Sequence, residues 1–447
     1  MKFVSILKIL PILFFTILLT NACDTTKRTS ETKSPEMEKS GDDNLTVDDV
    51  VDGTVEAIDE IAEELVNAFD EVVDTVDEKM DEMPKDSMGR ITLKKDTLGM
   101  KDSNKVIAKG KLITDSVHYA AETHLRNLKQ LTFGGDNAEA YWSFDNKELV
   151  FQASNKDWGD DCDQIYIIDP FGPVSKEQRP QLVSTGKGRT TCSYFMPGNK
   201  EVIYASTHLG DPNCPPTPKR RTDGKYVWPI YSDFDIFVAD EKGNNLRQLT
   251  DTPGYDAEAT VSPKGDLIVF TSIRTGDLEL YTMKIDGSEV RQVTFGLGYD
   301  GGAFFSPDGT KLIFRSSRPT TEESVTNYKN LLKEGLVQPT EMELYICNVD
   351  GSDLKKITEL GNANWAPFFH PSGKKVIFSS NHKSKRGFPF NLFMINVDGS
   401  GLEQITYDKT FDSFPMFSHD GKYLVFASNR NNGGTRDTNL FLAEWVD

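Results

Sequence analysis

The sequence predicts an all-β fold, a six-bladed β-propeller built from four-stranded antiparallel blades. The first observation is internal repetition: the stretch from Leu246 to Ser288 starts again at Val290, and a similar unit can be read six times. The second is that each unit holds four short apolar runs separated by turn-forming residues. Repeats of about 40–50 residues with four strands each are typical of propellers.

The third observation concerns the third apolar run of each unit, which is apolar at three consecutive positions, as in Ile268-Val269-Phe270. Strict alternation would predict one solvated face, whereas three apolar residues in a row predict a strand buried on both faces. Each sheet is therefore expected to pack between two neighbours. The first strand of the units starts at Gln130-Leu131-Thr132, Gln181-Leu182-Val183, Gln248-Leu249-Thr250, Gln292-Val293-Thr294, Lys356-Ile357-Thr358 and Gln404-Ile405-Thr406.

The chain begins with a targeting segment, residues 1–22. Lys2 and Lys8 flank the start of a short apolar core, Ile9–Leu19, which is too short to span a bilayer. Cys23 follows Thr20-Asn21-Ala22, a pattern that resembles a bacterial lipobox, so Cys23 is predicted to carry a lipid. An ordinary signal peptide with an incidental cysteine is the alternative. The predicted location is the bacterial cell envelope, lipid-anchored and facing the periplasm, with the outer membrane favoured over the inner membrane.

Three segments are expected between the anchor and the propeller: a disordered tether at 23–45, an acidic amphipathic helix at 46–83 and a linker at 84–124. The formal net charge is −19, and residues 42–82 contribute seventeen acidic residues against one lysine. The apolar residues of 46–83 recur at helical spacing. This helix is interpreted as a solvated spacer, a coiled-coil seam or a partner-binding helix. The remainder, 125–447, is nearly neutral and shows no basic stripe, so no nucleic-acid partner is predicted.

The repeat resembles that of TolB-like propellers, which are distantly related to WD repeats. The resemblance rests on the Q-L-T strand, the S-P-[DK]-G turn, the [LI]-[IV]-F-x-S-x-R strand end and the D-G-S turn, as in Ser306-Pro307-Asp308-Gly309 and Asp286-Gly287-Ser288. It covers residues 125–447. It implies a six-bladed propeller and a binding role at the envelope, with a peptidoglycan-associated lipoprotein as the kind of partner that such proteins engage. Its motifs are specific for the fold and weak for function.

The ring is predicted to close through its two ends. The propeller opens with a lone strand at Asn127–Thr132 and ends with Asn439–Ala443, the last-but-one strand of its unit. Pairing these two strands would complete the sixth blade and remove two exposed edges.

Two units carry long insertions, at His208–Phe234 and Pro319–Met342. Shorter extensions occur at Asn155–Asp163, Asn381–Pro389 and Asn429–Thr438. All five fall between the second and third strands of a blade, so one face is expected to be elaborated. The second insertion is expected to form a helix that starts with a capping box at Thr320 and Glu323. Aromatic and arginine side chains are typical of interface hot spots. The predicted partner-binding residues are Arg220, Arg221, Tyr226, Trp228, Tyr231 and Tyr328.

A ring of polar residues is predicted where the chain enters each innermost strand: Asn137, Thr190, Asp256, Asp300, Asn364 and Asp412. One interpretation is structural, with an arginine and an acid pairing across strands in each blade. The other is a funnel of carboxylates around the axis that holds Ca²⁺. Repetition in every blade favours the structural interpretation, because a functional site needs asymmetry.

Export implies an oxidising compartment. One disulfide is predicted, Cys162 with Cys192, and pairing of Cys214 with either is the alternative. A zinc site formed by these cysteines and His208 has no C-x-x-C spacing to support it. Cys347 is expected to be a buried free thiol.

Two classes of function remain. The favoured one is a non-enzymatic, lipid-anchored propeller that binds a protein or glycan partner, with the membrane contacted only through the lipid, and with no cofactor, metal or catalytic residue. The alternative is a calcium-dependent hydrolase or lactonase that uses carboxylates at the axis. No G-x-S-x-G motif occurs in the sequence.

Overall fold

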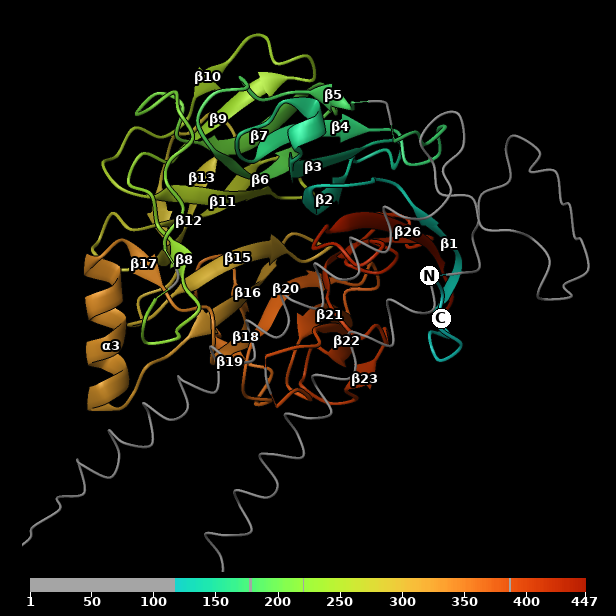
Figure 1. Cartoon of the computed structure of the whole chain (residues 1–447). Coiled ribbons are helices and arrows are strands. Elements are labelled where there is room, and N and C mark those ends of the chain that lie inside the picture. Colours follow the sequence, from blue (N-terminus) through green and yellow to red (C-terminus); the bar gives the residue numbers. More distant parts are fainter. Residues whose placement is uncertain (1–116, 177–178, 220, 386) are drawn as a thin grey trace, which may run out of the picture. The chain divides into compact units, whose positions relative to one another are not determined.

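The computed structural model describes residues 117–447, apart from 177–178, 220 and 386, and these form six four-stranded antiparallel sheets arranged as a propeller (Figure 1). The predicted lipid-bearing Cys23 and the predicted acidic helix at 46–83 lie outside the described residues. Among those described, no helix has the length and apolar character needed to cross a bilayer.

The first three blades, from the innermost strand outward, are as follows. Blade 1 contains β2 (Asp136–Trp142), β3 (Leu149–Ser154), β4 (Gln164–Ile168) and β5 (Gln181–Leu182), with a 3-10 turn η1 (Lys156–Trp158) between β3 and β4. Blade 2 contains β6 (Thr190–Phe195), β7 (Glu201–Ser206), β9 (Asp235–Asp240) and β10 (Arg247–Gln248). Blade 3 contains β11 (Asp256–Val261), β12 (Leu267–Ser272), β13 (Glu279–Lys284) and β14 (Arg291–Gln292).

The last three blades repeat this order. Blade 4 contains β15 (Asp300–Phe305), β16 (Lys311–Ser317), β18 (Met342–Asn348) and β19 (Lys355–Lys356). Blade 5 contains β20 (Asn364–Phe369), β21 (Lys375–Ser380), β22 (Asn391–Asn396) and β23 (Glu403–Gln404). Blade 6 contains β24 (Asp412–Phe417), β25 (Tyr423–Ser428), β26 (Asn439–Trp445) and, as its outer strand, β1 (Leu125–Gln130).

The predicted closure of the ring is confirmed. Strand β1 pairs antiparallel with β26, with Lys129 opposite Leu442 and Gln130 opposite Phe441. The backbone amide of Leu131 donates to the carbonyl of Leu440 at 2.7 Å, which continues the ladder past the end of β1. The prediction of doubly buried second strands is also confirmed, because Ile268, Val269 and Phe270 of β12 are all fully buried.

The folded region begins before Leu125, within the predicted linker. Glu122 is fully buried and forms an ion pair with Arg430 at 3.0 Å, and the Tyr119 hydroxyl donates to Asp408 at 2.6 Å. The sequence around Glu122 reads as a linker, because one buried acid does not produce the periodic apolar pattern by which a strand or helix is recognised.

The two large insertions meet on one face. Strand β8 (Trp228–Pro229) of the blade 2 insertion pairs with β17 (Leu336–Val337) of the blade 4 insertion, so a two-stranded ribbon crosses between them. Helix α3 (Glu322–Lys333) lies beside β17 (Figure 1). Its N-terminal cap is Thr321, whose hydroxyl accepts from the Ser324 amide, so the capping box predicted at Thr320 lies one residue too early.

Candidate functional site

Each innermost strand has a β-bulge, at the fourth residue of β2 and at the third residue of the other five strands, and the bulge residue faces the propeller axis. In all six strands the residue adopts a positive φ, between 43° and 59°. The pairing register shifts at the same point in each blade. Positive φ is costly for residues other than glycine, so the geometry that recurs in all six blades imposes it. The six residues are Glu139, Cys192, Glu258, Gly302, Ala366 and Phe414.

Five of these residues, all but Gly302, line a cavity of about 770 Å³ on the elaborated face. Its wall is rich in aromatic side chains from the insertions and from loops entering the strands. Tyr226 and Phe388, both on its lining, are 61% and 64% exposed. The cavity is of a size that suits a small molecule or a short segment of a larger partner. Further aromatic residues of the wall are Trp228, Tyr231, Phe234, Tyr255, Tyr299, Trp365, Phe390 and Phe411.

Below the cavity the axial channel narrows to a neck of about 40 Å³. Tyr141 and Phe304 line this neck, and aromatic rings from four innermost strands pack against one another around and below it, with centroid distances between 5.2 and 6.5 Å. They are Tyr141, Tyr194, Phe304 and Phe368. The cavity therefore has a packed aromatic layer beneath it.

An ion pair between Glu258 and Arg315 forms part of the cavity floor. The Glu258 carboxylate also accepts from the Thr271 hydroxyl at 2.7 Å, the Tyr299 hydroxyl at 2.6 Å and the Gly302 amide at 2.8 Å. Burial opposes ionisation of this carboxyl, but Arg315 and these donors outweigh it and lower the pKa of Glu258. The pair is therefore ionised, and its two charges cancel.

Two consecutive glycines in β15 make room for this pair. A side chain at Gly301 would come within 2.4 Å of a Glu258 carboxylate oxygen. Gly302 adopts a φ of 59°, and its amide donates to Glu258. A side chain at this position would collide with the Arg315 guanidinium. The Gly301-Gly302 sequence is thus required by the floor of the cavity.

Glu139 is the second acid of the floor, and its environment differs. Its carboxylate accepts from the Tyr141 hydroxyl at 3.3 Å and forms no ion pair with any described residue. Burial raises the pKa of Glu139 to about 7; the Cys192 thiol opposes this rise, and the nearby Glu258 carboxylate adds to it. The floor therefore contains one acid that titrates near neutral pH.

The predicted polar ring lies two residues before the bulges, and its members are buried among backbone and side-chain partners. Among them only Thr190 lines the cavity. Asn137 donates to the Thr438 carbonyl at 2.9 Å and Asn364 to the Met342 carbonyl at 2.8 Å. The three aspartates pair with arginines as the structural interpretation expects: Asp256 with Arg274 at 2.9 Å, Asp300 with Arg318 at 2.6 Å, and Asp412 with Arg430 at 2.8 Å.

The predicted partner-binding residues separate into two groups. Tyr226, Trp228 and Tyr231 all line the cavity. Arg221 instead forms ion pairs with Asp223 and Glu334, and Arg220 lies outside the described residues.

Tyr328 of helix α3 faces inward. It is 7% exposed, and its hydroxyl donates to Asp277, so it attaches the helix to blade 3 and presents no surface to a partner. Its burial gives no support to the prediction that it contacts a partner, which stays a prediction. Tyr328 and Leu331 lie on the same apolar face of helix α3, and both are buried. An apolar face of a surface helix ordinarily packs against the core in this way.

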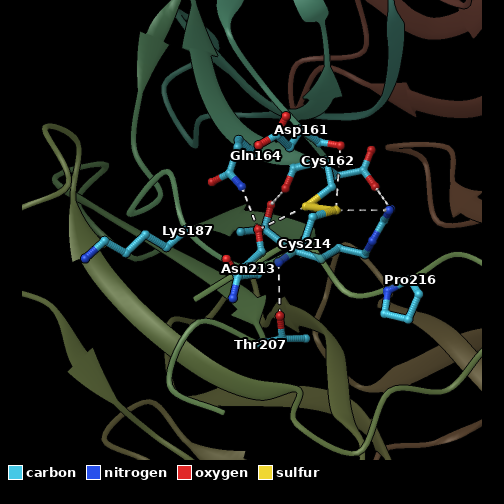
Figure 2. The surroundings of a disulfide bond; sticks show 12 residues. Asp161, Cys162, Gln164, Lys187, Thr207, Asn213, Cys214 and Pro216 are labelled. Carbon is cyan, nitrogen blue, oxygen red and sulfur yellow. Dashed lines mark hydrogen bonds and ion pairs between the residues drawn. A yellow bond between two sulfur atoms is a disulfide. The ribbon is translucent and has the colours of Figure 1, made fainter. Parts of the chain in front are cut away.

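The disulfide joins Cys162 to Cys214, with Cα atoms 5.8 Å apart, so the predicted Cys162–Cys192 pairing is wrong and the alternative holds (Figure 2). Cys192 is a free thiol because its bulge turns it to the axial cavity. Cys214 belongs to the blade 2 insertion, which returns to blade 1. The bond anchors that insertion beside Asp163 and Arg189, an ion pair in the cavity wall. Cys347 is free and buried, as predicted.

Sequence reasoning missed Glu139, Glu258 and Arg315. A signal exists: aligned on the repeat, the bulge position of the innermost strand varies among Glu, Cys, Gly, Ala and Phe, whereas the predicted ring two residues earlier is uniformly polar. Likewise, Arg315 occupies the variable position of the F-x-S motif. The corresponding residues in three other blades are small: Ala205, Ser379 and Ala427. Departure from the repeat marks the asymmetric positions.

Within the described residues, no three His, Cys, Asp or Glu side chains gather closely enough to hold a metal ion.

Comparison with known proteins supports the fold. Residues 229–336 match the model of the TolB beta propeller domain family. Together with the six blades, this identifies a TolB-like β-propeller. Among solved structures, a putative TolB from Agrobacterium tumefaciens is similar at 20% identity and a TM-score of 0.45, covering 70% of this chain and 91% of that one.

Two further structures are similar to this chain. TolB from Acinetobacter baumannii has 17% identity and a TM-score of 0.41, with 69% of this chain and 63% of that one covered. An oligogalacturonate lyase in complex with manganese has 12% identity and the same TM-score, with 70% and 90% covered. Likeness at this level extends to no ligand or activity.

Proposed function

We propose that this protein is a lipid-anchored binding propeller of the bacterial cell envelope, and that it holds a protein or glycan partner at its elaborated face without catalysing a reaction. The observation that carries this proposal is the aromatic-walled cavity at the axis of that face. Exposed aromatic side chains around a concave site are the usual anchors of binding surfaces.

The geometry of the insertions supports a binding role. Ordering long loops costs conformational entropy. Here the blade 2 insertion is fixed twice, by the Cys162–Cys214 bond and by the pairing of β8 with β17. Trp228 of β8 contacts Trp365 of β20 at 5.1 Å between centroids. The wall is thus organised before a partner arrives, which lowers the entropic cost of binding.

The alternative, a calcium-dependent hydrolase at the axial carboxylates, receives less support. Asp256, Asp300 and Asp412 are each engaged by an arginine, which leaves little negative charge to attract a cation.

A photo-crosslinking amino acid placed at Tyr226 in the native cells is expected to capture the partner, because this residue is 61% exposed and lines the cavity. The matched position is Leu354, which is 46% exposed in the loop between β18 and β19, on the opposite face. The adducts are to be compared by mass spectrometry. Equal capture of the same partner from both positions, or capture only from Leu354, would place the binding surface elsewhere.

The anchor is tested separately. Cys23→Ser removes the predicted acylation site, and the variant is expected to move from the membrane fraction to the soluble fraction, because one diacylated cysteine then no longer supplies membrane affinity. Fractionation followed by immunoblotting measures this. Continued sedimentation of the variant with membranes after a high-salt wash would contradict lipid anchoring through Cys23.

A further inference from the structure

We propose that the floor of the axial cavity binds the ammonium group of a lysine side chain of the protein partner, with Glu139 as its counter-ion and the aromatic wall around its carbon chain. This inference rests on the proposed binding function and names the chemistry that the partner presents.

The charges of the cavity lining lead to this assignment. Besides Glu139, the lining contains two acids and two arginines, and these neutralise one another as the pairs Glu258–Arg315 and Asp163–Arg189. Glu139 is the acid left without a cation among the described residues. With all five groups ionised, the lining carries one net negative charge. A ligand with a single positive charge would neutralise this charge.

The surroundings of Glu139 explain why a cation would bind strongly there. Cys192 from β6 and Tyr141 from its own strand are neutral donors, Glu258 from β11 repels the ionised form, and Arg315 from β16 attracts it but is already paired. Burial without a cation disfavours the carboxylate. A ligand ammonium group would remove that penalty, whereas a neutral ligand would leave it in place.

The aromatic wall fits the remainder of a lysine side chain. The rings of Tyr299 and Trp228 already receive a cation, since the Arg315 guanidinium lies 4.9 Å and 5.5 Å from their centroids. Tyr255, Trp365 and Phe414 also line the cavity and are free of such a contact among the described residues. Aromatic faces attract ammonium groups and also cover apolar methylene chains.

An anionic ligand is disfavoured by the same arrangement. Both arginines of the lining are engaged by acids, so a ligand carboxylate would displace an existing pair and approach Glu139 and Glu258. Like charges in a partly desolvated site repel strongly. Selectivity for a cation thus follows from pairing inside the protein.

The test uses the full-length protein in detergent and three capped pentapeptides, in which outer leucines and inner alanines flank a central lysine, norleucine or glutamate. Isothermal titration calorimetry at pH 8 is expected to give the lysine peptide at least about tenfold higher affinity than the norleucine peptide, and no detectable binding of the glutamate peptide. Equal affinities for lysine and norleucine, or binding of none of the three, would overturn the assignment.

Glu139→Gln is expected to abolish the preference for lysine over norleucine, while affinity for norleucine stays the same. The variant should fold, because it replaces a half-buried carboxyl that has no ion-pair partner among the described residues by a neutral group of the same shape, and thermal unfolding checks this. The control is Glu359→Gln, an exposed acid paired with Lys356 at the outer edge of blade 4. A lysine preference that survives Glu139→Gln would overturn the role of Glu139.

The pH dependence gives an independent readout. Binding needs ionised Glu139, whose pKa is about 7, and a protonated amine, whose pKa is about 10.4. Affinity for the lysine peptide should therefore rise from pH 5.5 to pH 8, with a slope approaching about tenfold per pH unit below 7. The Glu139→Gln variant should show no such rise. A flat profile for the unmodified protein would count against the proposal.

Glucosamine serves as a fourth probe, since an amino sugar also carries an ammonium group. Glucosamine binding tighter than the lysine peptide would overturn the assignment to a protein side chain. The proposed function is judged by the crosslinking at Tyr226, which does not depend on Glu139, so the two proposals can fail separately.

Discussion

Deleting residues 24–132 is expected to abolish cooperative folding, whereas deleting 24–116 leaves a folded propeller. The longer deletion removes β1 and exposes the outer edge of β26, which pairs with it. It also removes Leu125, Leu128 and Leu131, which are at most 2% exposed in the core. Loss of a buried leucine costs about 2–5 kcal/mol. Three such losses reach the whole stability of a typical domain, about 5–15 kcal/mol.

Circular dichroism during thermal unfolding measures this difference. The shorter deletion retains every described residue, so it controls for removal of the N-terminal region. Equal melting temperatures and equally sharp transitions for the two truncations would contradict closure of the ring by β1.

Arg430→Ala is expected to destabilise the protein by about 3–5 kcal/mol, because it leaves two fully buried acids without their cation. Arg430 pairs with Glu122 at 3.0 Å and with Asp412 at 2.8 Å, so it connects the segment before β1 to the start of β24. Urea unfolding monitored by tryptophan fluorescence gives the change in free energy of unfolding.

Arg436→Ala is the matched control, since Arg436 is an exposed arginine in the same loop; its effect is expected to stay within about 0.5 kcal/mol. The Arg430→Ala deficit should also shrink as pH falls. Burial raises the pKa of Asp412 even beside Arg430, and without the arginine this pKa rises further. A protonated Asp412 is neutral and is tolerated in the core. The variant is therefore destabilised most above that pKa and recovers stability as the pH falls below it. A deficit equal to that of Arg436→Ala would show that the pair is dispensable.

Several features could be predicted from the sequence because they repeat or are local. Each blade is a meander of adjacent strands, so its apolar runs and turns, such as Pro307-Asp308-Gly309, specify it without distant information. The repeats leave one unpaired strand edge at each end of the array, and this predicted the pairing of β1 with β26. The two strands are far apart in sequence, but the repeat pattern supplies no other partner for β1 or for the outer edge of β26. The five extensions all lie between second and third strands, and this fixed the elaborated face.

The cavity floor could be decided only by the tertiary structure. Glu139, Glu258 and Arg315 come from blades 1, 3 and 4. The bulges of β2 and β11 turn Glu139 and Glu258 toward the axis, and Arg315 reaches Glu258 from β16. A bulge shifts the two-residue alternation, so the direction of its side chain is invisible to a periodic pattern. The same shift placed Cys192 in the cavity and left Cys162 to pair with Cys214.

The sequence by itself therefore determined the number of blades, their closure and the face that carries the long loops, because repeating local patterns encode all three. Only the tertiary structure decided which acids are paired. Asp256 and Asp300 look available in the sequence but are held by arginines, whereas Glu139 looks unremarkable and is left unpaired. Ionic pairing depends on distances of a few ångströms between side chains from different blades, and no single repeat specifies those distances.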